Sequence, residues 1–168
     1  MPVRLNAIRP RKSPAYKLAD FERAMEAALE ETGKAMIRDF KRTVATWEHK
    51  PDFQIMGKVF KVGSRVVSIT VGTDDEIYGY VSLGTRPHII QPRSKPTLLF
   101  RQGYRAKTKP GRFLSKPGGA YGDWVAAKEV RHPGNEPRGF EELVRERHEK
   151  RGTLEKAIQS RWNKLGAK

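Results

Sequence analysis

Residues 18–47 read LADFERAMEAALEETGKAMIRDFKRTVATW, and this stretch decides the fold. From Phe21 to Trp47 apolar residues recur every three or four positions, which is the spacing of the buried face of a helix. Asp20 is the predicted N-cap, and the helix dipole favours acidic residues in the turns that follow it. The pattern predicts a long amphipathic helix. Gly33 is its expected weak point, because glycine costs about 1 kcal/mol relative to alanine inside a helix.

Beyond Pro51 the helical period gives way to short β-rich runs separated by glycine-containing turns. A C-terminal helical pattern begins near Pro137 and is interrupted at Arg151-Gly152. Strands that lie between terminal helices predict an α+β fold, with an antiparallel sheet of about four to five short strands packed against the long N-terminal helix and a C-terminal helix. The β-rich runs are 53–55, 58–62, 65–71, 98–100 and 124–131.

The positive charge is concentrated in two segments. The net charge is +15, and residues 84–131 hold eleven basic and two acidic residues, while residues 1–17 hold five basic residues and no acid. Such asymmetry favours a polyanion or an acidic partner surface. We expect residues 1–17 to form an extended basic arm, and residues 18–168 to form a single α+β domain that carries a long basic loop at about 101–122.

Composition excludes several kinds of chemistry. The chain has no cysteine, so it has no disulfides, no thiolate catalysis and no Cys-ligated metal. No stretch approaches the ~18 apolar residues of a membrane span, and the basic N-terminus lacks the apolar segment of a secretory signal. The four histidines do not fall at metal-ligand spacings. We therefore expect no metal, no cofactor and no membrane partner.

Two groups of residues suggest enzymatic alternatives. Asp74, Asp75 and Glu76 could hold Mg²⁺ in a nuclease, but they follow a strand-ending Gly-Thr, where Asp is favoured as a turn former and helix cap. A metal-free ribonuclease would need acid–base residues on a sheet face, and the candidates for that role show no spacing signature. We expect no enzymatic activity, and we keep a ribonuclease-like or other nucleic-acid-binding or processing protein as the alternative. The ribonuclease candidates are His88, Arg86, Tyr78 and Glu76.

The basic segment is the strongest candidate for a binding site, because its cations are interleaved with aromatic residues. Lys and Arg neutralise phosphates and aromatic rings stack on bases, but a docking arm that binds a neighbouring subunit uses the same residue types. Both interpretations stay open. The nucleic-acid or partner-docking candidates are Arg86, Arg93, Lys95, Arg101, Arg105, Lys107, Lys109, Arg112 and Lys116, with Arg4, Arg9, Arg11 and Lys12 in the N-terminal arm.

Two motifs carry a family resemblance. Residues 71–88 read VGTDDEIYGYVSLGTRPH and contain an Ile-Tyr-x-Tyr-Val-x-x-Gly-Thr-Arg core, and a His-Pro-Gly turn follows at 132–134. In these motifs, and in its order of long helix, hairpin and final helix over roughly residues 18–165, the chain resembles the tail-completion or neck (head–tail joining) proteins of tailed phages. The basic 101–122 segment and the 1–17 arm depart from shorter members of that family.

The resemblance implies a structural virion protein without catalytic residues, made in the host cytoplasm and located in the neck or tail of the virion. It implies a homo-oligomeric ring around the DNA channel, with a hexamer as one form. The implied partners are the tail terminator, the tail tube and the head–tail connector, together with the packaged DNA end, bound without sequence specificity. Gly84, Thr85, His132, Pro133 and Gly134 would form turns that shape the subunit.

Overall fold

The computed structural model describes residues 3–7, 18–61 and 66–166. Within them the chain forms four helices and nine strands, and the predicted α+β class is confirmed. The chain divides into two compact units, whereas the sequence predicted one domain over 18–168. The first, called the sheet unit, comprises Met1–Lys41, Asp52–Asp74 and Glu141–Lys168. The second, called the ribbon unit, comprises Arg42–Pro51 and Asp75–Phe140.

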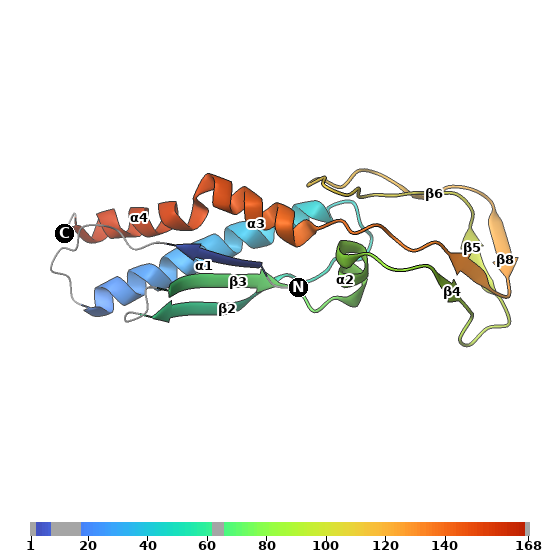
Figure 1. Ribbon diagram of the computed structural model, residues 1–168, viewed down its shortest axis with the longest axis horizontal. Coiled ribbons are helices and arrows are strands. Elements are labelled where there is room, and N and C mark those ends of the chain that lie inside the picture. The colour runs from blue at the N-terminus through green and yellow to red at the C-terminus, as the bar shows by residue number, and fades with distance from the viewer. Residues whose placement is uncertain (1–2, 8–17, 62–65, 167–168) are drawn as a thin grey trace. The chain divides into compact units, whose positions relative to one another are not determined.

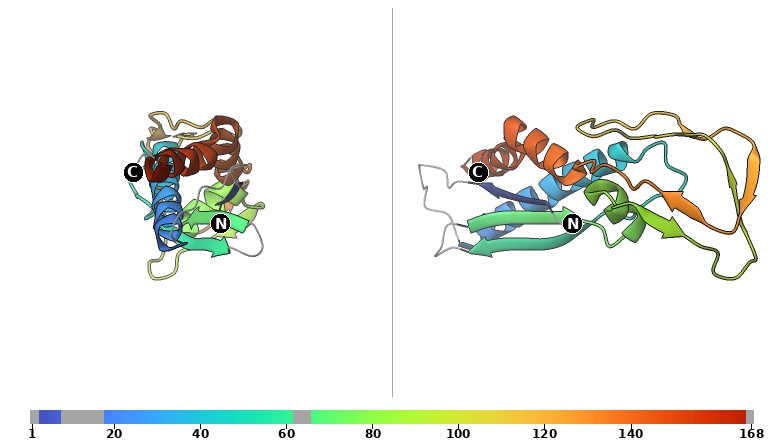
Figure 2. Two further views of the ribbon diagram at one scale, coloured as in Figure 1. Left: turned by 90° about the vertical axis from the view of Figure 1, so that its left-hand side faces the viewer. Right: turned by 45° about the vertical axis from the view of Figure 1, so that its right-hand side comes forward.

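The sheet unit is built on a three-stranded antiparallel sheet in the order β1–β3–β2, formed by Val3–Ala7, Val66–Gly72 and Gln54–Lys61. Val3 lies opposite Val71 and Leu5 opposite Ile69, and all four side chains are buried. Because side chains alternate along a strand, they share one face of the sheet. Helices α1 (Leu18–Thr43) and α4 (Thr153–Gly166) cover this face (Figure 1, Figure 2).

Residues 3–7 correct the predicted N-terminal arm, since they form strand β1 instead of an extended segment. The alternation of buried Val3 and Leu5 with exposed Arg4 is the strand signal, but it is too short to stand out among the neighbouring prolines and basic residues. Arg9, Arg11 and Lys12 lie outside the described residues. The sheet also has three strands where about four to five were expected, because the later strands pair with one another in the ribbon unit.

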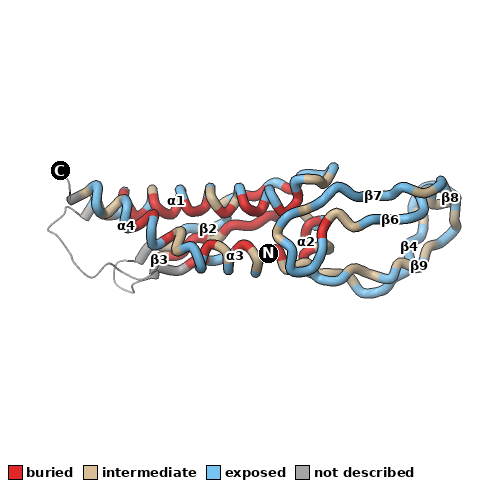
Figure 3. Tube along the Cα trace, turned by 90° about the horizontal axis from the view of Figure 1, so that it is seen from above, coloured by how far each residue is buried: buried red, intermediate tan, exposed pale blue. Residues whose placement is uncertain are grey.

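Helix α1 follows the predicted stripe closely. It begins at Leu18, so Asp20 lies in the first turn instead of at the N-cap, and its carboxylate pairs with Arg23. The apolar stripe is the buried face, drawn red along the helix in Figure 3. Within the sheet unit, its buried members are Met25, Ala28, Leu29, Thr32, Met36 and Phe40.

Gly33 is a site of close packing between α1 and the sheet, and this corrects its interpretation as a weak point. A Cβ atom built on Gly33 would lie 2.6 Å from Cδ1 of Ile55 and 2.7 Å from Cδ1 of Ile69. Real Cβ atoms do not approach other heavy atoms so closely. Glycine lowers the helix propensity at this position, but its lack of a side chain allows α1 to pack closely on Ile55 of β2 and Ile69 of β3.

The C-terminal helical segment is divided as the sequence predicted. Helix α3 (Phe140–Arg151) ends at Gly152, which adopts a left-handed φ of +57°, and α4 begins at Thr153. Such a conformation costs a residue with a Cβ about 1–2 kcal/mol, and glycine adopts it freely. Phe21 and Trp162 contact each other edge-to-face at 5.2 Å, which joins α4 to the start of α1.

Strand β2 is an edge of the sheet and carries a charge on its helix-covered side. Lys58 lies opposite Ile69, and its Nζ donates to the carboxylates of Glu26 (3.4 Å) and Glu30 (3.2 Å) on α1. The hydrogen bond to Glu30 raises the pKa of Lys58 above its ordinary value. A register shift between Ile55 and Gly57 interrupts the same strand.

The ribbon unit contains helix α2 (Glu76–Leu83) and three antiparallel strand pairs. The pairs are nested: each successive pair lies inside the previous one along the chain, so residues 85–135 form one long two-stranded ribbon, called the basic ribbon. The pairs are β4 (His88–Ile90) with β9 (Val130–His132), β5 (Leu98–Arg101) with β8 (Trp124–Ala127), and β6 (Tyr104–Arg105) with β7 (Gly119–Ala120).

This ribbon corrects two predictions. The expected structureless loop at 101–122 is part of a hairpin, with β6 pairing to β7. The single strand expected over 124–131 is two strands, β8 and β9, separated at Lys128-Glu129. Both errors have one cause: Gly, Pro and charged residues mask strands that have no buried face and so no alternating pattern.

Candidate partner-docking site

An aromatic cluster holds the base of the basic ribbon. Tyr78 of α2 stacks on Phe140 with ring centroids 5.7 Å apart, and Trp47 packs against both rings at 6.4 Å. Ser82 closes the other side, because its carbonyl oxygen accepts from the amides of Arg138 (2.9 Å) and Gly139 (3.1 Å). Its hydroxyl accepts from the amide of Phe140 at 3.2 Å. Helix α2 is thus joined to residues 138–140, which follow the ribbon, by one ring stacking contact and three hydrogen bonds.

The two sequence motifs meet at this base. Thr85 and Asn135 exchange both backbone hydrogen bonds at 3.0 Å, and the Thr85 hydroxyl also accepts from the Asn135 amide at 3.1 Å. Gly84 and Gly134 both have positive φ, of +79° and +84°. A Cβ on Gly134 would lie 2.2 Å from the Thr85 carbonyl oxygen, so only glycine fits there. The Gly-Thr and His-Pro-Gly turns therefore form one structure.

The two histidines of these motifs face each other across the ribbon. His88 lies opposite His132, with ring centroids 5.0 Å apart. His132 Nδ1 accepts from the Gly134 amide at 3.0 Å, and His88 Nδ1 lies 2.9 Å from the Arg86 carbonyl oxygen, to which it can donate. Both rings are thus positioned by their own backbone. His132 shapes the turn that connects β9 to the ribbon base.

The start of α2 is fixed by Asp75. Its carboxylate accepts from the Tyr78 amide at 2.7 Å, which makes it the N-cap, and it also contacts His49 Nε2. Burial alone would raise the pKa of Asp75, but the hydrogen bonds from His49 and Tyr78 outweigh burial and lower the pKa. Asp75 of the acidic cluster is therefore the cap of a helix, which is the role that the sequence favoured over the nuclease interpretation.

The predicted ribonuclease residues are not presented together to a substrate. Tyr78 is only 1% exposed, between Trp47 and Phe140. Glu76 lies in the first turn of α2, whereas His88 belongs to β4 and is held by the Arg86 carbonyl. Among the described residues no three His, Cys, Asp or Glu side chains gather as a metal site.

The basic ribbon exposes large apolar side chains. In β5 and β8, Leu99 lies opposite Ala126 and Arg101 opposite Trp124, so these four side chains share one face. Leu99 is 68% and Trp124 65% exposed. Pale blue and tan along the ribbon strands in Figure 3 show the same absence of burial. The further exposed members are Ile89, Ile90, Tyr104, Leu114 and Tyr121.

The strands of the basic ribbon contain no buried residue, so few packing contacts stabilise the ribbon by itself. Isolated two-stranded hairpins are marginal in water, and large apolar side chains exposed close together are typical of an interaction surface. Trp and Tyr each bury about 150–250 Å² when a partner covers them. The exposed face of β5 and β8 is therefore suited to binding a partner.

All nine predicted docking cations lie on the basic ribbon, and the structure distributes them along its whole length. Lys107 pairs with Glu48 at 3.3 Å. For the other eight, no carboxylate of the described residues lies within ion-pairing distance. Arg101 instead donates through Nε to the Gly122 carbonyl at 3.0 Å. The predicted arm residue Arg4 belongs to β1 of the sheet unit.

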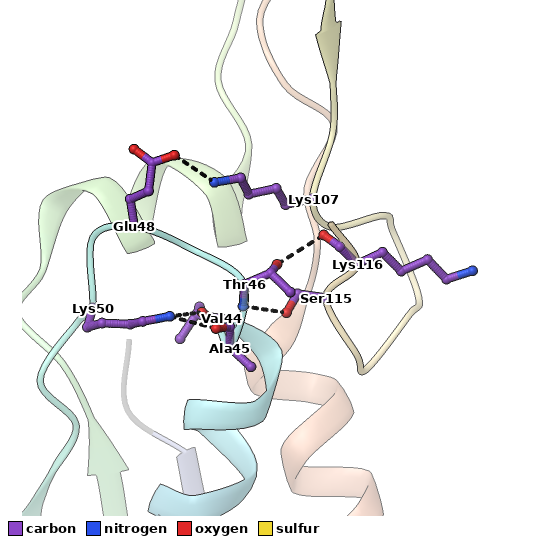
Figure 4. A network of polar contacts seen from close by, with 8 residues as sticks. All are labelled: Val44, Ala45, Thr46, Glu48, Lys50, Lys107, Ser115 and Lys116. Atoms are coloured by element: carbon purple, nitrogen blue, oxygen red, sulfur yellow. Dashed lines mark hydrogen bonds and ion pairs between the residues drawn. The ribbon is translucent and has the colours of Figure 1, made fainter. Parts of the chain in front are cut away.

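The far end of the ribbon returns to the segment that follows α1 (Figure 4). The Thr46 amide donates to the Ser115 hydroxyl at 3.2 Å, and the Thr46 hydroxyl donates to the Lys116 carbonyl at 3.0 Å. Lys50 Nζ donates to the carbonyls of Val44 (3.3 Å) and Ala45 (2.6 Å), which gives that segment its shape. The two hydrogen bonds of Thr46 join residues about seventy positions apart, so no local sequence signal could have indicated them.

No helix among the described residues is long and apolar enough to cross a membrane. Comparisons with protein-family models, with curated proteins and with solved structures found no match for this chain. The function therefore has to be argued from the ribbon and the two motifs.

Proposed function

We propose that this chain is a structural virion protein of a tailed phage, a tail-completion or head–tail joining subunit that forms a ring around the DNA channel. In this proposal the basic ribbon docks on neighbouring neck and tail proteins: the tail terminator, the tail tube or the connector. The observation that carries it is the exposed face of β5 and β8, with Leu99 and Trp124 in the open on a ribbon without a core of its own.

The motif resemblance supports the same proposal. The Gly-Thr-Arg and His-Pro-Gly motifs are joined by the Thr85–Asn135 hydrogen bonds at the base of the ribbon, where they set the path of both of its strands. A motif that shapes a docking element fits an assembly subunit. The ribonuclease alternative has no comparable support, because Tyr78, one of its candidate residues, is buried among aromatic rings.

Self-association of the purified protein tests the proposal. We expect sedimentation velocity and negative-stain microscopy to show a ring-sized oligomer, and we expect the double variant Leu99→Ser/Trp124→Ser to weaken it about thirtyfold or more, because central aromatic anchors are worth about 2 kcal/mol or more. Met56→Ser removes an exposed apolar side chain of the sheet unit and is the matched control.

Two results would overturn the proposal. One is a wild-type protein that stays monomeric and gains no partner when mixed with phage tails or DNA-filled heads. The other is reproducible cleavage of RNA or DNA, measured with and without EDTA, that is abolished by His88→Ala or Glu76→Gln.

A further inference from the structure

The end of the basic ribbon, residues 105–117 and called the ribbon tip, is a hairpin end that holds five basic residues. Lys109 and Arg112 flank a Pro-Gly turn that is closed by the Arg112 amide donating to the Lys109 carbonyl at 3.2 Å, with Gly111 at a φ of +66°. One step below, the Lys116 amide donates to the Lys107 carbonyl at 2.7 Å. Each of these two backbone hydrogen bonds joins two basic residues, and the side chains of Lys107 and Lys116 extend in opposite directions (Figure 4).

The tip holds little negative charge that could compensate its cations. Residues 105–117 include no Asp or Glu. Lys107 alone among the tip cations has an ion pair within the described residues, and its partner Glu48 is 96% exposed, where such pairs contribute little. The positive charge of the tip is thus left without internal compensation.

Five basic residues of the tip contribute to the lining of one cavity. Its volume is about 460 Å³, and its lining includes Arg105, Lys107, Lys109, Arg112 and Lys116. The tip is held in place beside this cavity by the contacts of Thr46 with Ser115 and Lys116 (Figure 4), which use backbone and hydroxyl groups and leave the Lys116 side chain unused. An ordered, concave, uncompensated cationic site is one that binds an anion.

We propose that the ribbon tip binds the phosphodiester backbone of nucleic acid, without reading its sequence. Double-stranded DNA carries a charge about every 1.7 Å along its axis, which is a denser and more regular row of anions than carboxylates on a folded protein surface. Lys and Arg side chains neutralise phosphates whatever the base sequence. The large aromatic anchors Tyr121 and Trp124 lie outside the tip.

The tip and the face of β5 and β8 then have separate roles. The inference deepens the proposed function, since a subunit of a ring around DNA would meet phosphates with the tip and protein with Leu99 and Trp124. DNA binding by the tip and oligomerisation through the face can be lost independently, so the two proposals fail in different measurements.

The test is fluorescence anisotropy of a labelled 30-base-pair duplex of mixed sequence, titrated with protein at several salt concentrations. The tip variant is Lys109→Gln/Arg112→Gln/Lys116→Gln. The control variant is Lys34→Gln/Arg145→Gln/Lys150→Gln, which removes two Lys and one Arg from exposed helix pairs of the sheet unit and so lowers the net charge equally. Circular dichroism and sedimentation confirm that both variants fold and associate as the wild type does.

We expect the plot of log K against log salt to lose about 2.7 from its slope in the tip variant, because each phosphate contact contributes about 0.9. The control variant should keep the wild-type slope. Equal losses in both variants would mean general electrostatic attraction and would overturn the assignment of the tip. Competition by poly-L-glutamate as strong as by the duplex would assign the tip to an acidic protein instead, and would also overturn it.

Discussion

Gly33 of α1 lies so close to β3 that any side chain on it would meet Ile69, whose Cδ1 atom is 2.7 Å from the position of a Cβ. Ile69 is fully buried in the middle strand, and Ile55 of β2 approaches Gly33 from the next strand over. The Ile55 and Ile69 side chains therefore occupy the space that a side chain at position 33 would need.

Gly33→Ala is expected to lower the free energy of unfolding by about 1–3 kcal/mol, because the overpacked methyl group outweighs the gain in helix propensity. Gly79→Ala is the control, since Gly79 lies within α2 and a Cβ there meets nothing within 4 Å. That variant should be stabilised, by up to about 1 kcal/mol. Urea denaturation measures both, and equal effects of the two substitutions would contradict the packing argument.

Gly134→Ala is expected to disrupt the ribbon base. The new Cβ would add left-handed strain, worth about 1–2 kcal/mol, to an approach of 2.2 Å to the Thr85 carbonyl oxygen, which is backbone and cannot move aside. Gly111→Ala, with a similar φ and open space around it, should cost only the strain. Limited proteolysis should cut the ribbon of the first variant much faster than that of the second. Similar cutting rates would refute a special role for the His-Pro-Gly turn.

Asp75 predicts a stability change in acid. Despite burial, its hydrogen bonds with His49 and Tyr78 lower the pKa in the folded state below the ordinary value of 3.8. The resulting stabilisation is present above that value and is lost as the pH falls through the lower folded pKa. Asp75→Asn keeps a good N-cap but cannot ionise. We expect the wild type to exceed this variant in stability by about 1 kcal/mol at pH 6, and we expect the difference to shrink as the pH falls through the folded pKa of Asp75. A difference that does not change with pH would be inconsistent with the ionised cap.

The burial of His148 leads us to expect a second pH dependence of stability, closer to neutral pH. The side chain is 3% exposed, and burial lowers the pKa of its imidazole below 6.5, against the opposing attraction of Asp39 and with further lowering by Arg151 and Arg147. Below pH 6.5 the unfolded chain takes up a proton that the folded chain resists, so stability falls as the pH falls from about 6.5 towards the folded pKa.

The check is urea denaturation at pH 7.5 and pH 5.0. His148→Gln is expected to be less stable than the wild type at pH 7.5, because it loses the contact of Nδ1 with the Thr153 hydroxyl at 3.0 Å. The gap should narrow at pH 5.0. A gap of the same size at both values would show that His148 does not titrate between them.

The sequence predicted those parts of the fold that repeat a period. The stripe of α1 and the break at Gly152 were correct because buried side chains recur along a helix and a glycine interrupts them. Gly33 was misjudged, since propensity describes a helix alone and not the strand beside it. Strand β1 was missed because five residues are too few to show a pattern beside Pro and basic residues.

The candidate site was predictable in part. Its charge was visible in the sequence, and the Gly-Thr and His-Pro-Gly turns were selected as structural, although their pairing through Thr85 and Asn135 was not foreseen. The ribbon itself was not predicted, because strands with two exposed sides lack alternation. Thr46 and Ser115 are 69 positions apart in the sequence, so their hydrogen bond could not be predicted from any local pattern.

Lys58 has a further consequence for how molecules of this protein can meet. It lies on the edge strand β2 and is held by Glu26 and Glu30, and a register shift between Ile55 and Gly57 interrupts the same edge. Lysine side chains and bulges on an edge are devices that prevent strand-to-strand polymerisation. An incoming strand that paired with β2 would meet an interrupted ladder and would have to displace the lysine. Fibrillar growth of the sheet is thereby blocked on the β2 side, which leaves β1 as the one edge where a strand of another chain could be added to the described sheet.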